Sequence, residues 1–315
     1  MNRFITSAES MVTTHEQTRT GFMQIALDKS RLCMPYVEEA YAFKAMTDGV
    51  RQPEELLDMP QVRAFLTTAS GLSDKSLNHL NGDDQIYAIQ ELIRNHLRPA
   101  GDQFLDEAVY RFLLIRGDTV GGSSRNRIGA LGQEKLIRTI LSCLSLRGME
   151  YDWLTKDKRV GWKHSTGLDM DIERDMKALH WHNDHGERVL AFNLNVPVVG
   201  KNVDLCLFSC DMDGYRAGKI AENVEAAVML GELKGGIDPA GADEHWKTAN
   251  TALQRIRDSY RGAGRQIRTS FVGAAIEHAM AQEIYRMLTN GLMDNAANLN
   301  NHNQLVEYCD WLITL

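Results

Sequence analysis

The fold is decided by the stretch GELKGGID, which spans residues 231 to 238. It ends an apolar run, Val224 to Leu233, whose composition predicts a buried strand. Alternate side chains share one face of a strand, so Glu232 and Lys234 should point the same way while Leu233 points to the opposite layer. The glycine pair that follows ends the strand and lets another backbone or a ligand come close. We therefore expect an acid and a base together at a strand end.

A second apolar run, Val203 to Phe208, carries one carboxylate, Asp204. If the two strands pair, Asp204 lies about 5 Å from Glu232 on the shared face. Two such carboxylates repel unless a cation lies between them, and Mg²⁺ prefers one or two carboxylates with water and phosphate oxygens. Lys234 would place positive charge where a phosphoryl oxygen becomes negative. An acid followed by Glu-x-Lys is typical of the PD-(D/E)xK nucleases, although a salt-bridged edge strand has the same pattern.

Composition restricts the class of protein. The chain has 315 residues, of which 43% are hydrophobic, and this is enough for one large domain or two. It has no run of about 18 apolar residues and no leader-like start, so we expect a soluble, unprocessed protein with no membrane partner. Five scattered cysteines lack metal spacing and favour a reducing, cytoplasmic compartment. The net charge of −7 argues against a uniformly basic surface.

Two segments are nevertheless locally basic. Arg111 to Arg138 holds six Arg or Lys residues against two acids, and His245 to Ser270 holds six against one. Each is either a nucleic-acid contact or a solvated helix face.

Periodicity divides the chain into two parts. Residues 1–148 are predicted to form a mainly helical subdomain, and residues 149–315 an α/β nuclease core with a mixed central sheet flanked by helices. The strands expected in the core are Tyr151–Leu154, Lys177–Trp181, Arg188–Leu194, Val203–Phe208, Val224–Lys234 and Ile267–Val272. The helices expected there are Ala242–Tyr260, Ile276–Thr289 and Leu305–Leu312.

A glycine-rich loop is expected from Arg116 to Arg127, between two helices of the first part. Small residues before a helix expose backbone N–H groups to an anion, and Arg125 would strengthen that field. The loop lacks the Lys-Ser/Thr ending of a Walker A motif, and an ordinary flexible turn remains the alternative.

Two other polar clusters compete with the central stretch. His180 and His182 share a strand face and are a plausible zinc pair, but their spacing also fits a polar strand end at a surface turn. Asp211 and Asp213 offer carboxylates that could replace Asp204, although Asp-x-Asp-Gly also fits a turn after the strand.

The residues around the central stretch indicate which group of nucleases the chain resembles. Residues 231 to 249, GELKGGIDPAGADEHWKTA, resemble the catalytic block of a group of type II restriction endonucleases. Residues 117 to 126, GDTVGGSSRN, resemble a second segment of such enzymes. Together with the length, and with Asp204 falling 28 residues before Glu232, the chain is similar to the AvaI/BsoBI group. Val203 stands where the motif name has proline.

This resemblance implies Mg²⁺-dependent cleavage of double-stranded DNA at C-Py-C-G-Pu-G by a homodimer. It implies a bacterial, cytoplasmic restriction system that also contains a cognate DNA methyltransferase. On the matching positions Asp204, Glu232 and the Leu233 carbonyl would hold the metal, and Lys234 would orient or activate the water. His245 matches a position with a general acid–base role, and imidazole suits that role near neutral pH.

The same resemblance suggests residues that contact DNA. Asp238 matches a base-reading position, and a carboxylate suits the N4 donor of cytosine. Lys75 is a candidate for a purine edge. Arg125, which lies in the second matching segment, is a candidate DNA-binding residue. Two alternatives stay open: a non-catalytic sequence-specific DNA-binding protein, for which no helix-turn-helix pattern is found, and a metal-dependent hydrolase of small phosphoesters.

Overall fold

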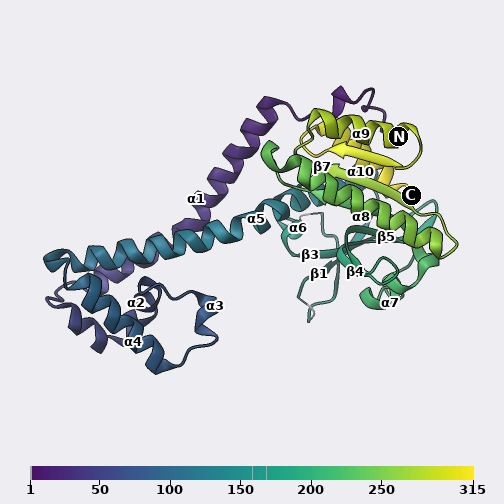
Figure 1. The fold of residues 1–315 in the computed structure, drawn as a ribbon. Helices are drawn as coiled ribbons and strands as arrows, with labels where there is room; N and C mark the ends of the chain where they lie inside the picture. Colours follow the sequence, from purple (N-terminus) through teal and green to yellow (C-terminus); the bar gives the residue numbers. More distant parts are fainter. Residues whose placement is uncertain (1, 158, 168) are drawn as a thin grey trace. The chain divides into compact units, whose positions relative to one another are not determined.

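The computed structural model describes residues 2–157, 159–167 and 169–315, without the side chains of residues 123–126 and 217 (Figure 1). The chain forms two compact units, one of residues 23–126 and one that combines residues 1–22 with 127–315. The first 22 residues therefore belong with the C-terminal part. The functional division that the sequence suggests, at residues 148 and 149, stays a prediction.

The unit of residues 23–126 is helical. Its elements are α1 (His15–Met46), which begins in the other unit, α2 (Arg63–Ala69), α3 (Asp74–Leu77), α4 (Gly82–Leu92) with a π-helical turn (Ile93–Leu97), and the first part of α5 (Phe104–Leu146). Asn81 caps α4, because its Oδ1 accepts hydrogen bonds from the amides of Asp83 and Asp84. Three stacked rings, Phe43, Phe65 and Phe112, hold α1, α2 and α5 together, with adjacent centroids 4.0 Å apart.

The loop expected from Arg116 to Arg127 is wrong, because α5 runs through it without a break. Glycine lowers helix propensity by about 1 kcal/mol per residue relative to alanine. Apolar residues on both sides keep the helical period, and Val120 within the stretch is buried. Packing on this apolar stripe outweighs the glycine cost. The backbone of Arg125 therefore lies in a helix, and its side chain lies outside the described residues.

The other unit is built on a sheet with the strand order β2-β1-β3-β4-β5-β6-β7-β8. The strands are β1 (Tyr151–Thr155), β2 (Trp162–His164), β3 (Met176–Asn183), β4 (Gly186–Val196), β5 (Lys201–Phe208), β6 (Ala227–Lys234), β7 (Arg268–Gly273) and β8 (Asn295–Asn298). Pairing is antiparallel from β2 to β6 and parallel from β6 to β8. The predicted mixed sheet is confirmed, with β2 and β8 in addition to the predicted strands. The strand expected from Val224 begins only at Ala227, because residues 224–226 form a 3-10 turn that is capped by the side chain of Asn223.

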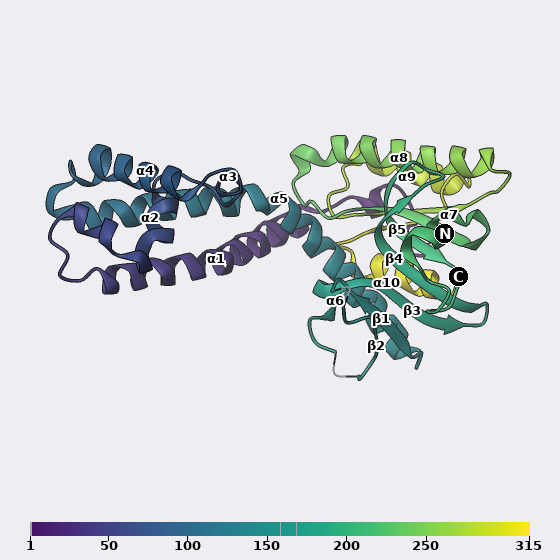
Figure 2. The same cartoon turned by 90° about the horizontal axis from the view of Figure 1, so that it is seen from below.

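Helices cover both faces of this sheet (Figure 2). Besides the start of α1 and the second half of α5, the helices of this unit are α6 (Ile172–Asp175), α7 (Ala217–Glu222), α8 (Ala242–Gly262), α9 (His278–Thr289) and α10 (His302–Ile313). Two adjacent residues of β7 show the two layers: Phe271 packs edge-to-face on Trp246 of α8, and the hydroxyl of Ser270 lies 2.8 Å from that of Tyr308 on α10. Since adjacent strand residues point to opposite faces, α8 and α10 lie on opposite sides.

Within the part of the chain that the structure describes, no helix is both long and apolar enough to cross a bilayer.

The second half of α5 packs closely on the end of β6. A Cβ added at Gly132 would lie 2.6 Å from the Cα of Gly235, which is closer than real Cβ atoms come. We expect Gly132→Ala to lower the free energy of unfolding by about 1 to 3 kcal/mol, because the two backbones must move apart. Gly129→Ala is the matched control: a Cβ there meets nothing within 4 Å, and alanine favours the helix. Denaturant unfolding followed by circular dichroism measures both, and equal stability of the two variants would contradict this packing.

Candidate active site

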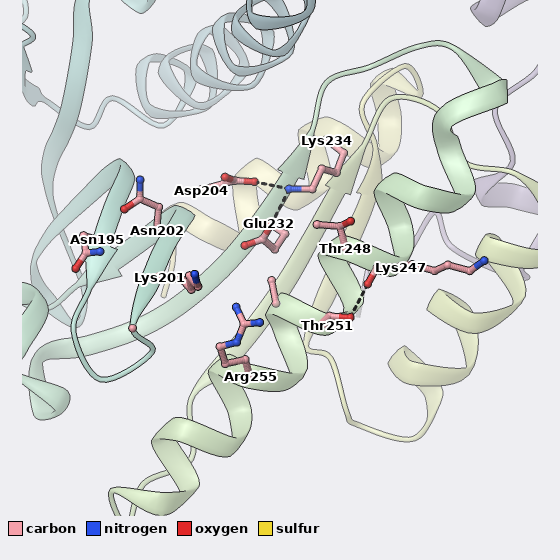
Figure 3. A pocket seen from close by; sticks show the side chains of 12 residues that line it. Asn195, Lys201, Asn202, Asp204, Glu232, Lys234, Lys247, Thr248, Thr251 and Arg255 are labelled. Carbon is pink, nitrogen blue, oxygen red and sulfur yellow. Dashed lines mark hydrogen bonds and ion pairs between the residues drawn. The ribbon is translucent and has the colours of Figure 1, made fainter.

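Three of the predicted site residues meet where β5 and β6 separate. The ladder between these strands reaches Leu205 and Gly231, and the next facing residues are Asp204 and Glu232. Lys234 Nζ lies 3.0 Å from Asp204 Oδ2 and 2.7 Å from Glu232 Oε2 (Figure 3). The expected shared face and cross-strand proximity are therefore observed.

Burial makes the charges of this cluster interdependent. The Glu232 side chain is 5% exposed, and burial followed by the nearby Asp204 charge raises the pKa of Glu232 to about 7, although Lys234 acts against this shift. Burial alone would lower the pKa of Lys234, but Asp204 and Glu232 together outweigh it and raise that pKa. The lysine thus remains a cation between two carboxylates.

The same atoms form a donor set that suits Mg²⁺. Leu233 N donates to Asp204 Oδ2 at 2.9 Å, so the amide of Leu233 faces β5. In a strand the C=O of a residue points to the same side as its N–H, so the Leu233 carbonyl also faces Asp204, beyond the last β5 pair. Two carboxylates and one carbonyl match a metal that completes its shell with water and phosphate oxygens. Among the described residues no three Asp, Glu, His or Cys side chains gather to hold a metal by themselves.

The cluster opens into a cleft of about 840 Å³ (Figure 3). Its walls come from the β4–β5 hairpin and from α8: Asn195, Gly200, Lys201, Asn202, Lys247, Thr248, Thr251, Ala252 and Arg255. Most of these residues are not among the predicted site residues. The basic segment from His245 to Ser270 contained the signal for Arg255, whereas no sequence pattern pointed to Lys201.

His245 and Asp238 lie on the chain just after the cluster. His245 is exposed on the first turns of α8, and its Nε2 lies 3.2 Å from the position of a Cβ on Gly241. It is not part of the cleft wall with Asp204. Asp238 is also exposed, and its Oδ1 accepts a hydrogen bond from Ala240 N at 3.0 Å, which caps the turn before α8. Lys75 is exposed on α3, in the other unit.

The two competing clusters have other partners. His180 is buried, and its ring nitrogens lie 3.2 Å from Asp152 Oδ2 and 2.7 Å from Glu187 Oε2, while His182 Nδ1 lies 3.3 Å from Glu187 Oε1. Asp211 Oδ1 accepts a hydrogen bond from Gly214 N at 2.6 Å, as the turn interpretation expects.

The buried Glu232 makes stability depend on pH in the absence of metal. Its pKa in the fold, about 7, lies above the ordinary value of 4.5, so its protonated form is the one the fold favours. The stabilisation of the fold by protonated Glu232 is therefore fully present below pH 4.5 and is lost as the pH rises through about 7. We expect the melting temperature of Glu232→Gln minus that of the wild type, both measured in EDTA, to increase as the pH rises from about 5 to about 8. Groups common to both proteins cancel in the difference, so a difference that does not change with pH would contradict the assignment.

Comparison with known proteins agrees with this geometry. The model of a family described as restriction endonuclease BsobI matches residues 1–315. The type II restriction enzymes AvaI of Nostoc sp. and of Anabaena variabilis are each 45% identical over 311 residues, which cover 99% of this chain and 98% of theirs. The type II restriction enzyme BsoBI of Geobacillus stearothermophilus is 44% identical over 311 residues, with 98% of this chain and 96% of its own covered. Because the match extends over the whole chain, the predicted resemblance is confirmed, and this protein belongs to the BsoBI family of restriction endonucleases.

Proposed function

We propose that this protein is a type II restriction endonuclease that cleaves double-stranded DNA at C-Py-C-G-Pu-G in a Mg²⁺-dependent reaction. The observation that carries the proposal is the cluster of Asp204, Glu232 and Lys234 in the wall of the cleft, in a chain of this family. A structural ion pair at an edge strand does not explain the cluster, since β6 lies inside the sheet and Glu232 is buried.

The metal site would consist of Asp204, Glu232 and the Leu233 carbonyl. Bound Mg²⁺ would polarise the phosphoryl group and lower the pKa of a coordinated water. Glu232 must lose its proton to serve as a ligand, and Lys234 favours this loss because its charge stabilises the carboxylate. The ammonium group of Lys234 then supplies hydrogen-bond donors for the attacking water or for a phosphoryl oxygen.

The cleft wall suits a polyanion. Lys201 and Arg255 line it, and Lys247 also does so but pairs with Asp243 at 2.6 Å. Cations at this position would neutralise DNA phosphates next to the metal site. His245 stays the proposed general acid–base residue, and its exposure leaves the imidazole open to solvent protons.

Recognition requires further residues and a second copy of the chain. Asp238 is proposed to read a cytosine amino group, Lys75 a purine edge, and Arg125 to contact the backbone. The C-Py-C-G-Pu-G class is palindromic, so a two-fold homodimer with one site per subunit cuts both strands with the same contacts. A cognate methyltransferase would protect the host DNA in the bacterial cytoplasm.

One experiment separates this proposal from its alternatives. The protein is incubated with plasmid DNA and Mg²⁺, and in parallel with EDTA. Discrete fragments that depend on Mg²⁺ support a site-specific endonuclease. Binding without cleavage would identify a sequence-specific DNA-binding protein, and release of phosphate from nitrophenyl esters alone a hydrolase of small phosphoesters.

Removal of either carboxylate should abolish cleavage but not binding. We expect Asp204→Ala and Glu232→Ala to lower the cleavage rate at least about a thousandfold, because several kcal/mol of transition-state stabilisation depend on the metal. The affinity for DNA, measured in EDTA so that the wild type does not cleave, should be kept or improved, because negative charge near the phosphates is removed. Asp213→Ala is the control, an exposed carboxylate close in sequence. Normal turnover of the Asp204 variant would remove that residue from the site.

Asp238 should act at one base pair only. We expect Asp238→Ala to lose about 1 to 3 kcal/mol of discrimination at an invariant C·G pair, because an acceptor for the cytosine amino group is gone. Cleavage of oligonucleotides changed one base pair at a time measures this loss. Asp243→Ala serves as control, because it removes a carboxylate in the first turn of α8 that pairs with Lys247. Equal losses at every base pair would show that Asp238 only caps its turn.

A further inference from the structure

Asn193 departs from the extended backbone of β4 directly opposite Asp204. In the β4–β5 register Phe192 pairs with Leu205, so the next residues, Asn193 and Asp204, face each other, but the ladder skips them. The φ angle of Asn193 is 52°, in the left-handed region that non-glycine residues rarely adopt and that asparagine tolerates comparatively well. Such departures collect at functional sites when the surrounding structure holds them in place.

An extended backbone would put the side chain of Asn193 beside the metal site. Ala191 and Cys206 pair with each other and are buried in the same core, and Asn193 and Asp204 lie two residues from them. By strand alternation, an extended Asn193 would therefore share the face of Asp204, with Cβ atoms about 5 Å apart. Instead, Asn193 Nδ2 donates to Oε1 of Gln133 on α5 at 2.7 Å. The left-handed turn thus keeps a side chain away from Asp204.

The same turn of α5 also contacts the end of β6. Gln133 follows Gly132, whose added Cβ would lie 2.6 Å from the Cα of Gly235, the residue after Lys234. One short segment of helix therefore touches β4 opposite Asp204 and β6 next to Lys234. Beyond Asn193, the tip of the β4–β5 hairpin continues into the cleft wall through Asn195 and Lys201.

We propose that Asn193 is a positioning residue for the Asp204 carboxylate. Its left-handed backbone leaves room beside Asp204 for the metal and the phosphate, and the bond to Gln133 directs its amide away from that space. The proposal deepens the proposed function and rests on it for the identity of the metal site.

The test compares valine and glycine at this position. Asn193→Val disfavours the left-handed region because valine is β-branched, whereas Asn193→Gly keeps it without steric cost. Asp171→Val and Asp171→Gly are the matched controls, because Asp171 also has a positive φ, 58°, but is not part of the cleft wall. Two quantities are measured as functions of Mg²⁺ concentration: the rise in melting temperature without DNA, and the rate of DNA cleavage. Asn193→Ala replaces the valine variant if that protein does not fold.

We expect Asn193→Val to need about tenfold more Mg²⁺ for the half-maximal effect in both measurements. A tenfold change corresponds to about 1.4 kcal/mol, which is the order of the penalty for a left-handed backbone at a non-glycine residue. Asn193→Gly should stay within about threefold of the wild type, because glycine keeps the backbone. Asp171→Val should lower the melting temperature at all Mg²⁺ concentrations but leave the Mg²⁺ dependence unchanged.

Three results would overturn the inference: a normal Mg²⁺ dependence of Asn193→Val, an equal defect in Asn193→Gly, or the same defect in Asp171→Val. Failure of the proposed function looks different, because the wild type itself would then cut no DNA. In that case the melting curves alone still decide whether Asn193 affects Mg²⁺ binding.

Discussion

A carboxylate buried at the end of a central strand is the constraint on which the site depends. Removing Glu232 from water penalises its charge, and the nearby Asp204 adds to that penalty. Lys234 compensates for part of it by bonding to both acids. A divalent cation held by the same oxygens would compensate further, because it adds a second positive charge. The ion pairs with Lys234 let the fold hold both acids together, and the proposed metal would reduce their mutual repulsion further.

The mixed sheet explains how such a cluster is both rigid and accessible. On one side of β6 the parallel ladder to β7 continues through Glu232, Leu233 and Lys234 to the end of the strand. On the other side the antiparallel ladder to β5 stops at Gly231, three residues before Lys234. The segment that carries the proposed catalytic residues is thus fixed by one neighbouring strand and open toward Asp204 on its other side. A sheet with two complete ladders at this point would hide the Leu233 carbonyl, and one with none would not hold the side chains in place.

Local patterns in the sequence predict the centre of this site well. Two nearly continuous apolar runs, each with a carboxylate near one end, predict the strand pairing that brings Asp204 to Glu232. The pattern fails where tertiary contacts decide. Glycines suggested a loop in α5, but packing on both sides keeps it helical. Strand β8, Asn295–Asn298, has no β-branched residue and owes its conformation to β7. Lys201 reaches the cleft only through the shape of a hairpin, which its own neighbours in sequence do not reveal.

The proposed catalytic lysine and the proposed base-reading residue are close in the sequence of this chain. Asp238 follows Lys234 by four residues, and the connecting turn passes Gly235, which touches the backbone of α5 at Gly132. A displacement of Asp238 toward a base pair would therefore pull on the segment that holds Lys234, while the contact with α5 resists it. Interiors packed this closely transmit small shifts instead of absorbing them. In the proposed enzyme, binding of a correct base pair by Asp238 would thus change the position of Lys234. Recognition and cleavage would be coupled through four residues of backbone.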